Sequence, residues 1–141
     1  MRTIIIERGQ AVQPKQYKEQ IDIEKVIILE GAKIGHGAFE GCSSITKVDI
    51  AEGVTIGRGA FMCCTGITKV NIAEDVILEK CAFMGCTGIT ELNIPEGMTI
   101  GEWVFFQCVV GITKLNIAKD AIIHKLAFES SKGITEVNIA E

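Results

Sequence analysis

The sequence has no apolar run that approaches the roughly 18 residues needed to span a bilayer. Its first seven residues are too short in apolar length to form a secretory signal. Basic residues are in the minority, with 14 Lys and Arg against 18 Asp and Glu, so the net charge is −4 and the pI about 5.3. This charge argues against a nucleic-acid-binding protein with a basic face, and no membrane insertion is expected.

Proline and leucine are scarce in a chain that is rich in glycine and isoleucine. There are 2 prolines against 15 glycines, and 5 leucines against 23 isoleucines. The length of 141 residues suggests one domain. A content of 48% apolar and 23% charged residues argues against disorder. The six cysteines form an even number, which is compatible with disulfides in a small domain.

A repeat of 22 residues accounts for these biases. Isoleucine and valine recur at the same step, as do glycine and cysteine. The period identifies a solenoid in which each repeat forms one coil. One extra residue falls at Val109-Val110 in the fifth repeat. The repeat phenylalanines are Phe39, Phe61, Phe83 and Phe105, followed after 23 residues by Phe128.

The first 25 residues are a degenerate and more polar copy of the repeat. Shifted by 22 residues, Tyr17 aligns with Phe39, and aliphatic residues align with aliphatic residues. End coils of repeat proteins need a polar outer face, because the core would otherwise meet water. We therefore expect residues 1–25 to form an N-terminal capping repeat and residues 26–141 to form the solenoid within a single domain.

Each repeat contains a V-x-I segment with the two-residue period of a β-strand, rich in the β-branched residues that pleated surfaces favour. The pattern predicts a β-rich α/β solenoid with a parallel sheet of about seven strands and one short helical turn per repeat. A second, shorter strand is expected at residues 54–56, and the helical turn at G-A-F-M-C, with Ala60 and Phe61 facing inward. The seven strands are expected at residues 4–6, 26–28, 48–50, 70–72, 92–94, 115–117 and 137–139.

The position after each strand holds glycine or aspartate. Both residue types tolerate a positive φ, so the pattern predicts a left-handed turn residue at this point of every coil. The members of this row are Gly9, Gly31, Gly53, Asp75, Gly97 and Asp120.

Two segments carry a resemblance to a known family: Ile-Pro-Glu-Gly-Met-Thr-Ile-Gly at 94–101 and Gly-Ala-Phe-Glu-Gly-Cys-Ser-Ser-Ile-Thr-Lys-Val at 37–48. The unit resembles the BspA-type leucine-rich repeat over nearly the whole chain. Isoleucine stands where leucine is usual, and V-T-I-G is one residue shorter than the family's V-T-x-I-G. The resemblance implies a right-handed solenoid that binds proteins. Better-known members of the family look like surface adhesins of bacteria and of parasitic protists.

Four cysteines recur in register, and a serine takes their place in the last repeat. Such a ladder spreads thiols along an axis, whereas a metal needs ligands that converge on one point. In-register side chains also point in parallel, which does not favour disulfides. We expect small buried residues and no metal or cofactor, with Cys63 and Cys81, outside the ladder, more exposed. The ladder consists of Cys42, Cys64, Cys86, Cys108 and Ser131.

The position after each repeat phenylalanine is apolar in the middle repeats and charged at both ends. An apolar centre with a charged rim is typical of a protein contact, where Trp and Met are enriched. The alternative is that this row packs under the edge of its own coil. The apolar members are Met62, Met84 and Phe106, with Trp103, Val109 and Val110 nearby in the fifth repeat.

Asn71, Asn93 and Asn116 lie between the two inward residues of their strands, so they point outward. The family resemblance implies that this face binds a ligand. The alternative is a ladder in which stacked side chains hydrogen-bond to one another. In the first strands the same row holds Ile5 and Ile27, which predicts a small exposed apolar patch, unless the N-terminal residues cover it.

The leading hypothesis is a non-enzymatic protein-protein interaction module, whose partner is another protein or a second copy. Self-association is a concrete version, because the strand at 137–139 leaves an open edge. The alternative is a structural or surface ladder protein, adhesin-like or binding cations or ice, suggested by a row of glutamates and a row of threonines. These rows are Glu30, Glu52, Glu74 and Glu96, and Thr46, Thr68, Thr90, Thr113 and Thr135.

No feature of the sequence indicates an enzyme. His36 and His124 have no repeating acid or nucleophile nearby, and no G-x-S-x-G or phosphate-binding loop is present. Free thiols suit a reducing compartment. We therefore expect a cytoplasmic protein if the chain is complete, and a cell-surface or secreted one if it is part of a longer family member.

Overall fold

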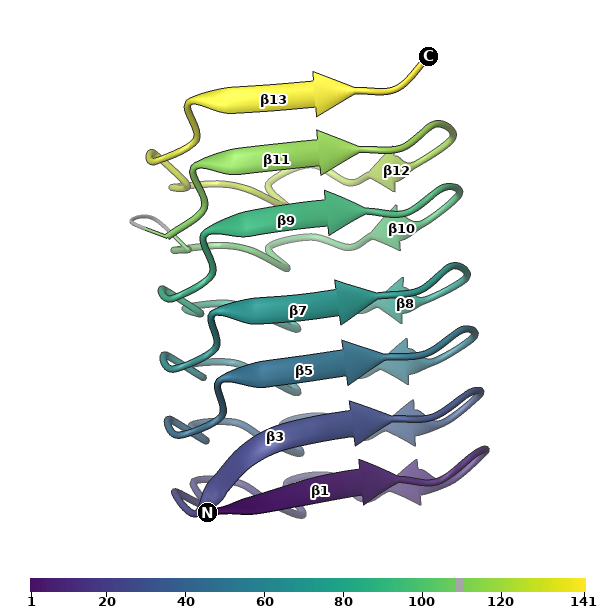
Figure 1. Ribbon diagram of the computed structural model, residues 1–141, viewed down its shortest axis with the longest axis vertical. Coiled ribbons are helices and arrows are strands. Elements are labelled where there is room, and N and C mark those ends of the chain that lie inside the picture. Colours follow the sequence, from purple (N-terminus) through teal and green to yellow (C-terminus); the bar gives the residue numbers. More distant parts are fainter. Residues whose placement is uncertain (109–110) are drawn as a thin grey trace.

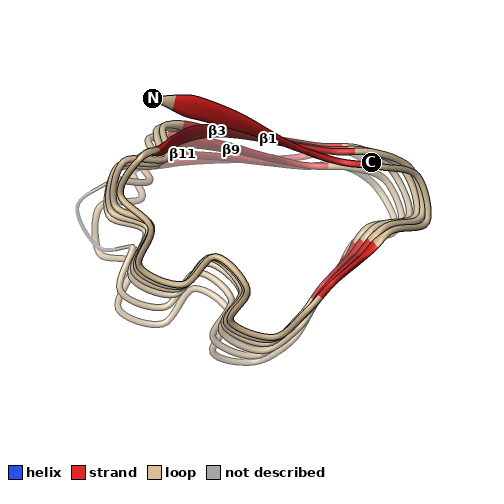
Figure 2. Ribbon diagram, turned by 90° about the horizontal axis from the view of Figure 1, so that it is seen from below, coloured by secondary structure: helices blue, strands red, loops and turns tan. Residues whose placement is uncertain are grey.

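The computed structural model describes residues 1–108 and 111–141 and shows a parallel β-solenoid of six coils, followed by the first strand of another (Figure 1). Val109 and Val110, which were expected near the contact residues of the fifth repeat, lie outside the described residues. Viewed along the axis, each coil passes from a longer strand through a loop to a two-residue strand, and returns through a series of turns (Figure 2).

Successive strands pair in parallel one repeat apart, so that Val48 lies beside Val70. The longer strands are β1 (Arg2–Ile6), β3 (Ile23–Ile28), β5 (Lys47–Ile50), β7 (Lys69–Ile72), β9 (Glu91–Ile94), β11 (Lys114–Ile117) and β13 (Glu136–Ile139). The short strands are β2 (Ala11–Val12), β4 (Lys33–Ile34), β6 (Thr55–Ile56), β8 (Ile77–Leu78), β10 (Thr99–Ile100) and β12 (Ile122–Ile123), and they form one six-stranded sheet.

The longer strands do not form the single sheet of about seven strands that the sequence predicts. They divide into a four-stranded sheet, β1-β3-β5-β7, and a three-stranded sheet, β9-β11-β13. Within the described part of the chain, no backbone hydrogen bond joins β7 to β9. Pro95 supplies a physical reason. At its repeat position Ala73 donates its amide to the Ile50 oxygen at 2.9 Å, and Ala118 to the Ile94 oxygen at 2.9 Å, but proline has no N–H.

This gap between β7 and β9, called the seam below, reaches into the core. The ring centroids of Phe83 and Phe105 are 5.9 Å apart, whereas the other stacked pairs of the column are 4.9 to 5.2 Å apart. On the side of the turns the two coils remain bonded, since the Phe83 amide donates to the Val104 oxygen at 3.0 Å. The coils therefore separate at their longer strands, and they stay joined at their turns and at the paired short strands β8 and β10.

The expected helical turn in each repeat is wrong, because this segment is a series of tight turns. The amides of Ala38 and Glu40 donate to carbonyl oxygens three residues earlier, whereas those of Phe39 and Gly41 donate to oxygens of the next coil. A helix would direct every amide along its own segment. A φ of 71° at Gly41 also lies outside the helical region. Since the described residues contain no helix, the fold is all-β rather than α/β.

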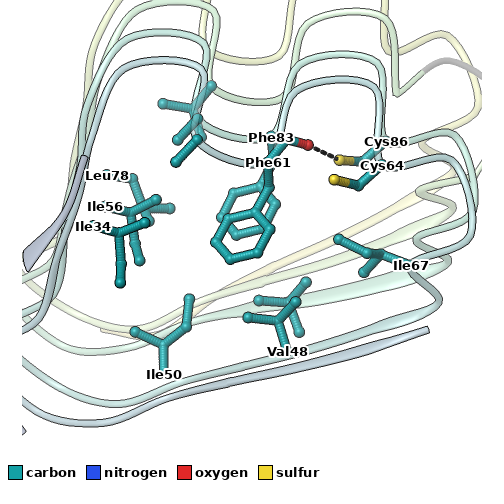
Figure 3. Close-up of a cluster of buried hydrophobic side chains, with 14 of the residues drawn as sticks. Ile34, Val48, Ile50, Ile56, Phe61, Cys64, Ile67, Leu78, Phe83 and Cys86 are labelled. Atoms are coloured by element: carbon teal, nitrogen blue, oxygen red, sulfur yellow. Dashed lines mark hydrogen bonds between the residues drawn. The ribbon is translucent and has the colours of Figure 1, made fainter. Parts of the chain in front are cut away.

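The core consists of side-chain columns that run along the solenoid. Ala60 and Phe61 are fully buried, as predicted. Figure 3 shows Phe61 stacked on Phe83, with Val48 and Ile50 of β5 reaching the core from the opposite side. Tyr17 stacks on Phe39 at 4.9 Å, which confirms the 22-residue alignment of the first repeat. The capping role of residues 1–25 stays a prediction.

The predicted left-handed turn residue is confirmed in every coil. All six members of the row have φ between 58° and 70°, whether they are glycine or aspartate. This turn lets the chain leave the longer strand and enter the short strand of the same coil.

Candidate functional site

Met62, Met84, Trp103 and Phe106, called the contact stripe below, lie on the side of the turns. Met62, Met84 and Phe106 each follow a buried phenylalanine, and Trp103 lies two residues before Phe105. All four side chains are half-buried. Figure 3 shows Phe61 entering the core from the side opposite β5, so the neighbouring Met62 belongs to the outer surface of the turns. The stripe therefore presents apolar surface to solvent while its side chains also rest on the coils.

Trp103 is held in place from three coils. The Lys80 ammonium lies 4.6 Å from the centre of its ring, and its indole N–H donates to Glu129 Oε2 at 3.1 Å. Its ring centroid is 6.4 Å from that of Phe106. Trp103 also has a φ of 56°, which is unusual for a bulky residue. Every residue at this repeat position has a φ between 56° and 63°, so the left-handed turn belongs to the coil and is not particular to Trp103.

A hollow of about 310 Å³ lies beside the two methionines of the stripe. It is called the methionine hollow below. A second hollow, of about 740 Å³ and lined in part by Lys33 and Glu79, shares His36 and Arg58 with it. The residues of the methionine hollow that matter here are Lys15, His36, Arg58, Gly59, Met62 and Met84.

The sequence analysis did not identify the basic residues of this hollow as a group. The signal was present, because His36, Arg58 and Lys80 occupy one repeat position in successive repeats. Lys15 comes from a different repeat position and joins them only through the stacking of coils.

The asparagine row largely satisfies its own hydrogen bonds. Asn71 Nδ2 donates to Asp49 Oδ1 at 2.6 Å, and Asn116 Nδ2 donates to Asn93 Oδ1 at 2.7 Å. No such bond joins Asn71 to Asn93 across the seam within the described residues. Along much of the row the side chains thus hydrogen-bond to one another, as in the ladder alternative. The role of the row in binding stays a prediction.

Ile5 and Ile27 are neighbours on paired strands, as the predicted apolar patch requires. Ile5 is 53% exposed and Ile27 is half-buried. Both belong to the strand face, with the asparagine row, and the contact stripe lies across the core from them. The nine predicted binding residues therefore form two separate surfaces, of which only the contact stripe adjoins the methionine hollow.

Comparison with protein families supplies the deciding observation. The model of the BspA type leucine rich repeat region matches residues 10–139 in six copies. The chain belongs to the BspA-type leucine-rich repeat family. A search of the curated proteins finds no match.

Two solved structures share the fold of this BspA-type chain. A leucine-rich repeat protein from Bacteroides ovatus is 18% identical with a TM-score of 0.70, and the match covers 99% of this chain and 42% of that one. A leucine rich cell surface protein from Faecalibacterium prausnitzii is 15% identical with a TM-score of 0.57, and the match covers 99% and 60%. The chain thus spans about half the length of these relatives.

The four cysteines of the ladder in these BspA-type repeats are buried, as expected, and their thiols also form hydrogen bonds. Each thiol donates to the carbonyl oxygen of the stacked aromatic residue in the coil before: Cys42 Sγ to the Tyr17 oxygen and Cys64 Sγ to the Phe39 oxygen, both at 3.0 Å. In the last coil Ser131 Oγ donates to the Phe105 oxygen at 3.1 Å. Burial raises the pKa of the four thiols, that of Cys108 to about 12. All six cysteines are free.

The remaining polar candidates lie on the surface. His36 and His124 are exposed, and Glu96 of the acidic row pairs with Lys119 at 3.4 Å. Within residues 1–108 and 111–141, no group of three or more His, Cys, Asp or Glu is placed to hold a metal ion. The same residues include no helix long and apolar enough to cross a membrane.

Two of the six thiols should react with a thiol reagent such as Ellman's reagent at mildly alkaline pH. Cys63 is exposed and Cys81 is half-buried, whereas the ladder thiols keep their protons because burial raises their pKa, and the thiolate is the reactive form. Titration of the native protein should show two fast thiols, and titration in denaturant should show all six. Fast reaction of Cys64 or Cys86 in the native protein would contradict this account of the core.

Proposed function

We propose that this chain is a non-catalytic protein-binding module and that the contact stripe makes the contact. The support comes from Trp103, which is half-exposed but held between Lys80 and Glu129. A fixed aromatic side chain loses little conformational entropy on binding, and tryptophan is enriched among residues that dominate interface energies.

The surroundings of Trp103 suit a contact of this kind. Phe106 and Met84 extend the apolar surface, and methionine adapts its shape to different partners. Glu40 and Glu129 flank the apolar members of the row that follows the repeat phenylalanines, where they form a charged rim. An apolar centre inside a charged rim favours a partner that buries the stripe and leaves its edge in water.

Replacing Trp103 by glycine should remove the anchor without disturbing the backbone. Glycine occupies the same repeat position at Gly37 and Gly59, where φ is 61°, close to the 56° of Trp103. Domains selected on the wild-type protein from a displayed library should bind Trp103→Gly about thirtyfold more weakly, as expected for an interface residue worth about 2 kcal/mol.

The matched control is Gln107→Gly. Gln107 lies in the same coil, is exposed and has a φ of 58°. This variant should bind the selected domains as the wild type does. Selected domains that bind Trp103→Gly and a Met62→Asp, Met84→Asp double variant as well as they bind the wild type would contradict the proposal.

Self-association through β13 is a second version of the same function. Val137 and Ile139 are 49% and 70% exposed, whereas their equivalents Val48 and Ile50 in β5 are buried. These side chains and the unpaired edge of β13 would be covered by a further coil or by a second copy of the chain.

Sedimentation velocity over a range of protein concentrations tests this version on the chain itself. We expect a dimer or larger species that is reduced to monomer by Ile139→Lys, because a charged side chain at the contact opposes burial. Lys132→Glu, an exposed residue of the same coil, should have no effect. A wild-type monomer at high concentration would rule out self-association through β13 and leave the contact stripe as the proposed surface.

A further inference from the structure

We infer that the methionine hollow takes an aromatic side chain from the partner, and that the basic residues at its rim hold a carboxylate beside that side chain. The inference rests on the proposed function, because Met62 and Met84 belong to the contact stripe. It adds the chemistry of the partner: an extended segment that carries an aromatic residue next to an aspartate or glutamate.

The fifth repeat shows how an aromatic side chain can fit at the position of this hollow. Trp103 occupies the same repeat position as Gly59, where the side chain is missing. Around Trp103 stand Lys80 from the preceding coil, Phe106 from its own coil and Glu129 from the next coil. The equivalent residues around Gly59 are His36, Met62 and Met84.

Gly59 and these three residues all line the methionine hollow. The hollow is therefore the space that an aromatic side chain fills two coils further along the solenoid. A side-chain carbon added to Gly59 would lie 3.7 Å from the end of Met62, which is ordinary van der Waals contact. An aromatic ring inserted from outside can meet the same methionines, and sulfur–aromatic contacts are favourable.

The charges around the hollow complement an acidic residue beside that ring. Within the described residues Lys15, His36 and Arg58 form no ion pair. The acidic residue of the hollow, Glu40, is paired with Lys18 at 3.5 Å. The rim can thus accept a carboxylate from a partner without first breaking an internal salt bridge. The larger adjoining hollow adds Lys33 on one side and is bounded by Glu79 on the other.

Selection of short random peptides displayed on phage, with the purified protein as target, tests the inference. We expect enrichment of sequences in which Trp, Phe or Tyr stands next to Asp or Glu. Their binding should weaken as salt is raised from about 0.1 M to about 1 M, because the screening length falls from about 10 Å to about 3 Å.

Three variants separate the possible outcomes. Arg58→Glu should weaken the enriched peptides about tenfold by reversing a charge at the rim. Gly59→Trp should abolish their binding by filling the hollow with the residue that the fifth repeat already carries at a similar φ. Lys125→Glu is the matched control, since Lys125 has the repeat position of Arg58 but lies three repeats away, outside the hollow.

Peptides that lack acidic residues, or that bind Arg58→Glu as well as the wild type, would overturn the inference. So would a selection that enriches no peptide. Peptides whose binding is weakened by Trp103→Gly but unchanged by Arg58→Glu and Gly59→Trp would also overturn it. That result would leave the proposed function intact.

Discussion

Backbone hydrogen bonds between successive coils hold every other feature of this molecule in place. They hold each coil in register with the next, so that side chains stack on side chains of the same kind. Phe39 stacks on Phe61 at 5.0 Å, and Phe61 on Phe83 at 5.2 Å. In the turns these bonds use alternate amides, which is why the segment cannot form a helix. At the seam beside Pro95 the bonds between β7 and β9 are absent, and the phenylalanine stacking is wider at the same step.

The same stacking determines how the surface varies. Inside the solenoid the residues of a row vary little, because every member packs on its two neighbours. Outside, a row can change from one coil to the next, and the local differences create the candidate sites. The position of Trp103 is the clearest case. Glycine there in the second and third coils leaves a hollow, whereas tryptophan in the fifth fills the corresponding space.

Much of the interior could be predicted from the sequence, because a period of 22 residues assigns each residue to a row. Phe61, Cys64 and the left-handed turn at Asp75 all followed from their rows. The turns after the short strand did not, because a local pattern such as G-A-F-M-C does not reveal which amides point to the next coil. The seam depends on one proline and on a neighbouring strand that is 22 residues away in sequence. The methionine hollow depends on side chains from different rows, which only the stacked coils bring together.

The account requires that coil-to-coil amide bonds control the strand side of the solenoid, and hydrogen exchange of the β9 amides tests this most directly. Pro95→Ala restores a donor for the Ile72 carbonyl oxygen, so the amides of Glu91 and Asn93 should exchange more slowly than in the wild type. The matched variant Ala73→Pro removes the 2.9 Å bond to Ile50, and it should speed exchange in β7 and lower the free energy of unfolding by about 1 kcal/mol or more. Wild-type β9 amides that exchange as slowly as those of β5, and that do not respond to Pro95→Ala, would contradict the account.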